Sequence, residues 1–380
     1  MKKLLIMASL FWPQKNSGGP PISILNLVNS IKDSFDIYII SKNHEINDDK
    51  PLEGISSGWN QFEFGKAIYL SREEHTLKRV RKIIEEINPD VIYQNSFFSY
   101  DDLLPVLFYK KRHRDVKVIV APRGEFYPER IQVGKTKKNI YGFMFRVSGL
   151  LKDVYFQGTG KEECDQEKEF LGIPDDHLLD IQNLSISTKL NSRIIEKKPG
   201  ELRLVYIARV HPTKNLLNAI EWLKTLDGNI QYDIYGSIED DNYWESCLHE
   251  IKMLPENIKV SYLGVIDHDL VATTIENYHV YYMPTTGENF GHSIVESMLG
   301  RRPVLISDQT PWTDIDSIGG YAIPLNENER FVSALMRFQA MNQDEFNQMC
   351  DNAHEYINNK LNIEIIKQQY IEAFNGAKYG

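Results

Sequence analysis

Cysteine and net positive charge are both scarce in this sequence of 380 residues. The three cysteines, Cys164, Cys247 and Cys350, are too few and too far apart to predict a disulfide framework or a cysteine-based metal site. We therefore expect the reducing environment of the cytoplasm. The formal net charge of −10 argues against a partner such as nucleic acid, because domains that bind nucleic acid are usually basic.

Long apolar runs and an excess of glycine or proline are also missing. No run approaches the roughly 20 residues that cross a bilayer as a helix. With 42% hydrophobic and 25% charged residues, 23 glycines and 16 prolines, the composition is that of a globular protein and excludes disordered and collagen-like chains. At roughly 150 residues per domain, the length predicts two large domains.

The amino-terminal segment 1–12 has the charged start and apolar centre of a secretory signal, which is one interpretation. Against it, no small-x-small cleavage site follows. The chain continues instead with Trp12-Pro13, a turn rich in glycine and proline, and an amphipathic stretch. This order predicts a buried strand, a glycine loop and a helix.

Short apolar runs alternate with helix-period segments through most of the chain, as in parallel sheets covered by helices. We expect strands at 4–10, 36–40, 90–94, 117–120, 154–157, 178–181, 202–207, 231–235, 258–262, 280–283, 304–306 and 321–323. We expect helices at 22–32, 73–87, 103–111, 139–150, 216–226, 243–252, 268–276 and 293–299, and helical structure beyond residue 328.

The domain boundary is predicted at a charged segment that ends in Pro199-Gly200. It separates an amino-terminal domain, 1–190, from a carboxyl-terminal domain, 200–360, and a final helix at about 361–380 is expected to pack back on the first domain. The fold class is therefore α/β, with two Rossmann-like, doubly wound domains facing across a cleft. In such sheets, ligands bind beyond the carboxyl ends of the strands.

One candidate anion site follows the strand that ends at Met283. A loop with proline and glycine leads to a helix that begins near Gly291, and the first N–H groups of a helix lack intrahelical acceptors. Glu288 and Glu296 are spaced to hold hydroxyl groups at the two ends of a bound pyrophosphate ester. The alternative is an ordinary strand–loop–helix connection with two solvated glutamates.

A second segment follows the strand 202–207 and places Arg209 and Lys214 at its carboxyl end. Arginine grips a phosphate with a planar fork and lysine adds a point charge, so the pair is suited to neutralise a diphosphate at the helix start. The alternative is two surface cations near a turn.

Together, Arg209, Lys214 and the spacing from Glu288 to Glu296 resemble the donor-site signature of glycosyltransferase family 4, whose members are retaining enzymes of GT-B fold. The resemblance extends over essentially the whole chain. It implies a nucleoside-diphosphate sugar as donor, bound mainly by the second domain, and a glycan or lipid-linked glycan acceptor, bound mainly by the first. It also implies no cofactor and no catalytic metal; we expect UDP rather than GDP as the nucleotide.

The resemblance assigns Arg209, Lys214 and Glu288 as catalytic residues. The cations hold the phosphates and stabilise the leaving diphosphate, while Glu288 faces hydroxyls of the transferred sugar and Glu296 binds the ribose. The remaining donor-binding positions are Gly18, Gly19, Gly236, Val265, Asn289, Phe290, Gly291, His292 and Ser293. For the glycines at 18 and 19, a turn that only needs backbone freedom is the alternative.

In the first domain, Arg123 and Glu125 follow a strand, and with Lys135 they are candidates for the acceptor side. Many family members have a histidine near this position, so the catalytic helper of this domain is left open. A structural role for Arg123 and Glu125, paired with each other or with a neighbour, is the alternative.

Residues 107–152 have a net charge of +9, which leaves −19 on the rest of the chain. Aromatic and apolar residues alternate with these cations, so this face is suited to an anionic membrane or a lipid-diphosphate acceptor. A solvated basic face is the alternative.

The sequence therefore predicts a retaining hexosyl- or N-acetylhexosaminyl-transferase of cell-surface polysaccharide biosynthesis, in the cytoplasm or at the inner face of the membrane. A nucleotide-sugar epimerase of GT-B fold and a non-catalytic two-domain ligand-binding protein remain the alternatives.

Overall fold

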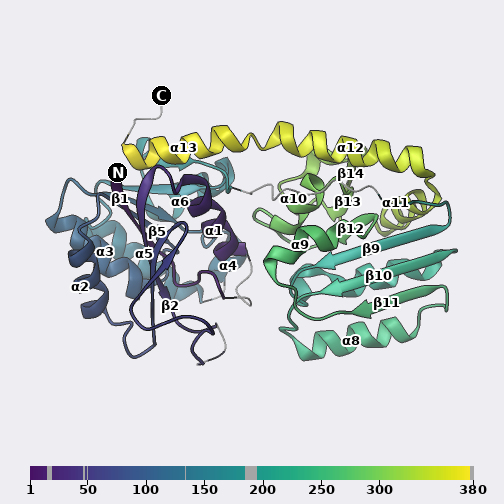
Figure 1. Ribbon diagram of the computed structural model, residues 1–380, viewed down its shortest axis with the longest axis horizontal. Helices are drawn as coiled ribbons and strands as arrows, with labels where there is room; N and C mark the ends of the chain where they lie inside the picture. The colour runs from purple at the N-terminus through teal and green to yellow at the C-terminus, as the bar shows by residue number, and fades with distance from the viewer. Residues whose placement is uncertain (15–18, 46–47, 49, 133, 185–194, 377–380) are drawn as a thin grey trace. The chain divides into compact units, whose positions relative to one another are not determined.

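The computed structural model describes residues 1–14, 19–45, 48, 50–132, 134–184 and 195–376. The chain forms two compact units, each with its own parallel sheet. Unit 1 comprises residues 1–186 and 363–380, and unit 2 comprises residues 187–362. The predicted fold class, two Rossmann-like α/β domains, is confirmed (Figure 1).

Unit 1 contains an eight-stranded sheet in the order β3-β4-β2-β1-β5-β6-β7-β8. All neighbouring strands are parallel except the edge pair β3–β4. The strands are β1 (Lys2–Met7), β2 (Phe35–Lys42), β3 (Trp59–Phe62), β4 (Gly65–Leu70), β5 (Val91–Asn95), β6 (Lys117–Ala121), β7 (Val154–Gly158) and β8 (Leu178–Asp180).

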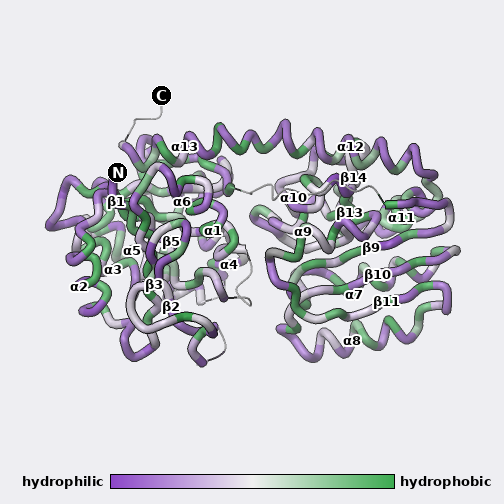
Figure 2. Tube along the Cα trace, in the orientation of Figure 1, coloured by the Kyte–Doolittle hydropathy of each residue, from purple (hydrophilic) through white to green (hydrophobic). Residues whose placement is uncertain are grey.

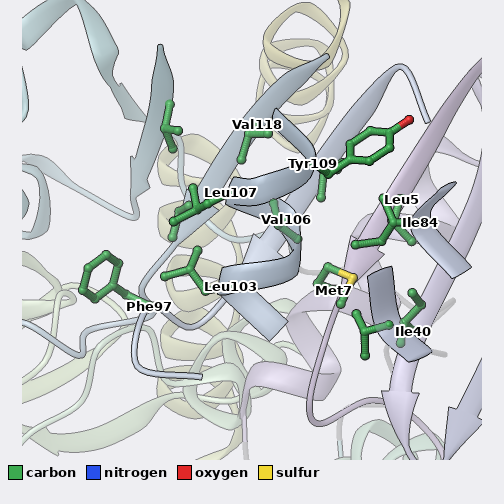
Figure 3. Close-up of a cluster of buried hydrophobic side chains, with 14 of the residues drawn as sticks. Leu5, Met7, Ile40, Ile84, Phe97, Leu103, Val106, Leu107, Tyr109 and Val118 are labelled. Atoms are coloured by element: carbon green, nitrogen blue, oxygen red, sulfur yellow. The ribbon is translucent and has the colours of Figure 1, made fainter. Parts of the chain in front are cut away.

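The helices of unit 1 lie on both faces of this sheet. They are α1 (Gly19–Ile31), α2 (Leu77–Ile87), α3 (Tyr100–Arg112), α4 (Pro128–Gln132), α5 (Lys135–Ser148), α6 (Lys161–Leu171) and α13 (Ile363–Asn375), with a 3-10 turn at Asp175–His177. Side chains of β1, β2, β6, α2 and α3 contribute to one buried hydrophobic cluster, part of which is drawn in Figure 3. Helix α13 contacts α1, and its Phe374 packs against Phe35 and Tyr93 of the sheet.

Unit 2 contains a six-stranded parallel sheet in the order β11-β10-β9-β12-β13-β14. The strands are β9 (Glu201–Ile207), β10 (Asn229–Tyr235), β11 (Ile258–Tyr262), β12 (Val280–Met283), β13 (Val304–Ser307) and β14 (Gly320–Ile323). The helices are α7 (Leu216–Glu221), α8 (Asp241–Lys252), α9 (His268–Ile275), α10 (His292–Leu299), α11 (Asn328–Ala340) and α12 (Gln343–Lys360), and 3-10 turns occupy Pro212–Lys214, Trp222–Thr225 and Thr313–Ile315.

The strand order places β9 beside β12 at the point where the winding of the sheet reverses. Because β9 continues into β10 on one side and β12 into β13 on the other, the connections after β9 and β12 diverge at this point. Open α/β sheets bind ligands at such a switch point, beyond the carboxyl ends of the strands. We therefore expect a ligand site at the segments that follow Ile207 and Met283.

The strand cores are buried because they are continuously apolar, as expected for a sheet covered on both faces. Hydropathy alternates along the helices that cover the sheets (Figure 2), as it does in helices with one buried face. All three cysteines are buried free thiols. Among the residues that the structure describes, no helix is long and apolar enough to span a membrane.

Candidate donor site

The candidate site of unit 2 is formed by the loops that follow β9 and β12. The carbonyl of Thr213 accepts hydrogen bonds from the Thr286 N–H at 2.8 Å and from the Thr285 hydroxyl at 2.9 Å. The Ser307 hydroxyl, at the end of β13, donates to the Thr285 carbonyl at 2.5 Å. These bonds connect the carboxyl ends of three strands that are neighbours in the sheet, β9, β12 and β13. They fix the loops on which the candidate residues lie.

Lys214 and Glu288 meet across these loops. The Lys214 Nζ lies 2.5 Å from Glu288 Oε2, and both side chains are largely buried. Lys214 ends a 3-10 turn, and Asn215 follows it with a left-handed backbone (φ 56°), which starts α7 in a new direction. The backbone N–H of Glu288 donates to the Gln309 carbonyl at 2.9 Å. The structure thus brings together one cation and one carboxylate from the two predicted motifs.

Helix α10 begins directly beside this pair. Its N-cap, Gly291, has a left-handed backbone (φ 74°) and no side chain that could cap the helix. A Cβ at Gly291 would lie 2.8 Å from the Ile294 side chain and 3.0 Å from Glu288 Cγ, so glycine is required by space as well as by backbone angle. The positive end of the helix dipole therefore lies beside the Lys214–Glu288 pair without a side-chain cap.

Trp312 supports the loop before α10. Its indole Nε1–H donates to the Phe290 carbonyl at 2.6 Å, and its ring packs edge-on against Phe290 with 5.5 Å between centroids. Ser293 lies 2.7 Å from the hydroxyl of Tyr281, which itself donates to the Ile207 carbonyl at the end of β9. Trp312 is thus a buried support of the loop, the role that its apolar size favours.

Glu296 lies one turn further along α10 and is almost fully buried. Burial raises the pKa of its carboxyl group to about 8, because the charged form loses its hydration. His268, at the start of α9, approaches it with Nε2 3.7 Å from Glu296 Oε1. A carboxyl group that holds its proton near neutral pH can both donate and accept a hydrogen bond.

Arg209 forms an ion pair with a carboxylate that lies outside the two predicted motifs. It follows β9, but its Nη1 lies 2.7 Å from Glu239 Oε2, in the connection after β10. The Arg209 side chain is 40% exposed. The structure therefore places Arg209 at the carboxyl end of β9, as predicted, but in an ion pair with a residue that the sequence did not single out.

Gly236 and Val265 lie at the carboxyl ends of the next two strands. A Cβ at Gly236 (φ 144°) would lie 1.9 Å from the carbonyl oxygen of Ala208, so only glycine fits beside β9 here. The Gly236 N–H donates to the Gly264 carbonyl at 2.9 Å, which brings the exposed Val265 into the same row of strand ends. Asn289 is half-buried and His292 buried in the loop and first turn of α10.

The first-unit candidates are held by their own neighbours. Arg123 (φ 58°) donates to Asn95 Oδ1, at 3.1 Å from Nε and 3.0 Å from Nη2, to the Tyr93 hydroxyl at 2.9 Å, and to Asn183. Glu125 accepts from the Ser96 hydroxyl at 2.5 Å and from two backbone N–H groups, although burial still raises its pKa. Each group therefore has a structural set of partners.

The other first-unit predictions lie apart from that network. Lys135 is exposed at the first position of α5, and Gly19 begins α1. Gly18 lies outside the described residues.

Sequence reasoning missed the residues that support the site. Thr213, Thr285, Ser307 and Glu239 act through hydrogen bonds or ion pairs between segments that are 22 to 72 residues apart in sequence. Their positions after strands are the only sequence signal that indicates them. Among the described residues, no cluster of three or more His, Cys, Asp or Glu side chains is arranged to hold a metal ion.

One family model matches part of the chain, and solved structures match nearly all of it. Residues 187–356 match the model of the family described as "Glycosyl transferases group 1". No curated protein matches the chain in sequence. The matched residues lie within unit 2, which carries the candidate site.

Solved structures resemble the whole chain. Sucrose-phosphate synthase from Thermosynechococcus elongatus is 15% identical with a TM-score of 0.71, and the similarity covers 99% of both chains. Anabaena HepE in complex with UDP and glucose is 14% identical with a TM-score of 0.70, covering 99% of this chain and all of that one. A variant of S. aureus TarM in complex with fondaparinux, α-GlcNAc-glycerol and UDP is 14% identical with a TM-score of 0.66 and covers 99% of this chain and all of TarM.

Proposed function

We propose that the protein is a retaining glycosyltransferase of family 4, which transfers a hexosyl or N-acetylhexosaminyl group from a nucleoside-diphosphate sugar to a hydroxyl group of a glycan. The observation that carries the proposal is the Lys214–Glu288 pair at the start of α10, at the switch point of the unit 2 sheet. A cation, a helix N-terminus and a sugar-facing carboxylate are the groups that a donor of this kind requires.

The chemistry follows from where charge develops. Departure of the nucleoside diphosphate places negative charge on its phosphate oxygens and positive charge on the anomeric carbon. Lys214 and the N–H groups at the start of α10 stabilise the first charge. Arg209 joins them once the phosphates compete with Glu239 for its guanidinium group. Glu288 then turns from Lys214 toward the hydroxyls of the sugar.

Glu296 is suited to bind the ribose of the nucleotide. Its protonated carboxyl group donates one hydrogen bond and accepts another, which matches a pair of ribose hydroxyls. Val265 is exposed after β11, and Gly236 carries no side chain at the end of β10, which suits a base that is recognised through the main chain. We propose UDP as this nucleotide, in keeping with the UDP named in the HepE and TarM complexes.

The proposed mechanism uses no metal ion and no covalent intermediate on Glu288. The leaving phosphate accepts the proton of the attacking hydroxyl on the same face of the sugar, so the anomeric configuration is retained. The acceptor is a growing glycan of a cell-surface polysaccharide, assembled on the cytoplasmic side of the membrane.

The test is turnover. The protein is incubated with a panel of UDP-sugars and saccharide acceptors without added metal, UDP release is measured, and the anomeric proton of the product is assigned by NMR. Acceptor-dependent UDP release with a retained configuration supports the proposal. Inversion of configuration contradicts the retaining mechanism, and a new sugar formed without acceptor identifies an epimerase instead.

A further inference from the structure

Helix α5 carries an apolar stripe that faces solvent. Ile140 precedes Phe143 and Met144 by three and four residues, and Val147 follows Met144 and Phe143 by three and four residues. All four therefore lie on one face of the helix. Their exposed fractions are 56%, 63%, 60% and 67%. Exposed apolar side chains scattered singly need no explanation, but four neighbours on one helix form a contiguous patch of the kind that marks a binding surface.

The opposite face of α5 is already packed, so the stripe cannot turn inward. Phe145 belongs to the hydrophobic core of unit 1 and packs against Phe97, with 5.2 Å between ring centroids. Gly142 faces Phe170 of α6 so closely that a Cβ would lie 2.6 Å from its ring. The helix is therefore apolar on both faces: its inner face packs within unit 1, and its outer face is exposed.

The flanks of the stripe are basic. From Arg130 to Lys152 the chain has no aspartate or glutamate. Lys135 and Lys137 are exposed in the first turn of α5, beside the amino-terminal end of the stripe. Two other cations of the segment have structural partners: Lys138 donates to the Arg130 carbonyl at 2.7 Å, and Arg146 donates to the Glu169 carbonyl at 2.8 Å. The exposed lysines remain available to an external anion.

We propose that the outer face of α5, which comprises Lys135, Lys137, Ile140, Phe143, Met144 and Val147, docks on an anionic lipid bilayer. Apolar side chains on one side of a helix enter the boundary between headgroups and acyl chains, while flanking lysines bind the anionic headgroups. This pairing of an apolar stripe with local positive charge stands out because the chain as a whole is acidic. The inference rests on unit 1 alone and is independent of the function proposed for unit 2.

A second copy of the chain is the main competing occupant. In a symmetric dimer the same patch meets itself. Because residues 130–152 contain no aspartate or glutamate, the patch of the second copy would offer the exposed lysines no carboxylate partner. A bilayer that contains phosphatidylglycerol supplies negative charge on all sides of the stripe. Charge complementarity therefore favours the lipid surface.

The test is flotation of the full chain with vesicles. Vesicles of phosphatidylcholine and phosphatidylglycerol in equal amounts should bind the protein, and vesicles of phosphatidylcholine alone should bind it far more weakly. Replacing both Phe143 and Met144 by serine should lower the partition coefficient about tenfold or more, since each loses several buried carbon groups. Lys137→Glu should lower it severalfold and make binding less sensitive to salt.

Met253→Ser is the matched control, because Met253 is equally exposed (62%) but lies in unit 2, just after α8. It should leave vesicle binding unchanged. If the double variant does not fold, as judged by circular dichroism, Ile140→Ser tests the same stripe with a single change. The three native cysteines are buried, so a Phe143→Cys variant labelled with an environment-sensitive fluorophore reports insertion directly as a blue shift.

Three results would overturn the proposal. They are a lack of binding to anionic vesicles, binding that the serine variants leave unchanged, and a dimer in light scattering that the serine variants dissociate. The last result would assign the stripe to a second copy of the chain.

Discussion

At the scale of single residues, Lys214 forms a close ion pair with Glu288 in the candidate site. It is buried against Glu288 at the carboxyl ends of the unit 2 strands, and it lies beside a helix start that no side chain caps. A buried cation and carboxylate compensate each other, and removing one of them leaves the other charge without its partner. The pair is therefore sensitive to substitution in a way that surface ion pairs are not.

Lys214→Ala should lower the affinity for a nucleoside diphosphate by about a hundredfold, because the phosphates lose a cation and meet an uncompensated Glu288. Calorimetric titration measures the change. Lys224→Ala is the control, since Lys224 forms a half-buried ion pair with Glu250 in the same unit, away from the carboxyl ends of the strands. Equal affinities of the Lys214 variant and the wild type would contradict the assignment of Lys214.

Glu296 predicts a specific dependence of stability on pH. Its pKa is about 8 in the folded protein and near 4.5 when exposed. Between these values the unfolded chain loses the proton that the folded chain retains, so ionisation favours unfolding increasingly as pH rises from 4.5 to 8. Below this window the group is neutral in both states and contributes no such difference.

Glu296→Gln should therefore raise the unfolding temperature of the ligand-free protein more at pH 8.5 than at pH 5, because glutamine is neutral throughout. Differential scanning fluorimetry at both pH values measures this. A difference between variant and wild type that is the same at both pH values would show that Glu296 is not held neutral by burial.

At the scale of secondary-structure elements, the packing of β9 against β10 depends on a glycine. The Cβ of any other residue at position 236 would collide with the Ala208 carbonyl, immediately before Arg209. The backbone angle, φ 144°, also lies in a region that other residues rarely adopt. Both effects act on the connection that carries the candidate phosphate-binding residues.

Gly236→Ala should destabilise the protein by about 2 kcal/mol or more, because strain and a backbone collision add. Chemical unfolding measures the change. Gly287→Ala is the control, because a Cβ there meets nothing within 4 Å and its φ is not positive. Equal stabilities of the two variants would contradict the packing described for Gly236.

The predicted elements agree with the structure in most of the strands, because continuous apolar runs bounded by polar turns are hard to place elsewhere. The predicted helices were less accurate at their starts: α1, α3 and α5 begin at Gly19, Tyr100 and Lys135 rather than at residues 22, 103 and 139. Their first turns are polar or rich in glycine and proline, so periodicity shows them poorly.

Some elements were missed for a physical reason. Helix α6 buries Glu163 and Glu167, and Glu163 accepts hydrogen bonds from the Gly124 and Thr159 backbone N–H groups at 2.5 and 2.9 Å. Acidic residues in a sequence indicate a solvated face, so a helix that buries them has no clear apolar period. The β3–β4 hairpin was missed because its outer strand is half exposed at the sheet edge.

At the scale of the whole molecule, the chain leaves unit 1 and returns to it. The carboxyl-terminal helix α13 packs on the unit 1 sheet through Tyr370 and Phe374, and the Tyr370 hydroxyl accepts a hydrogen bond from Gln157 Nε2 at 3.1 Å. Unit 1 therefore completes its core with residues from the end of the chain. Contacts this distant in sequence cannot be located by local periodicity.

Phe374→Ala should destabilise unit 1 by about 3 kcal/mol or more, because it removes an aromatic side chain from between Phe35 and Tyr93. Limited proteolysis with mass spectrometry should show faster cleavage within residues 1–186 and unchanged cleavage within 195–362. Faster cleavage in both regions alike would contradict a separate core for unit 1.

The proposed function requires that the carboxyl ends of the unit 2 strands, at Lys214 and Glu288, bind a nucleoside diphosphate. Calorimetric titration of the protein with UDP and then with GDP, without added divalent metal, tests it most directly. We expect UDP to bind in the micromolar range or tighter, without metal, because the pocket holds the phosphates with its own cations, and we expect GDP to bind more weakly. Binding of neither nucleotide, with or without metal, would show that this site does not hold a nucleoside diphosphate.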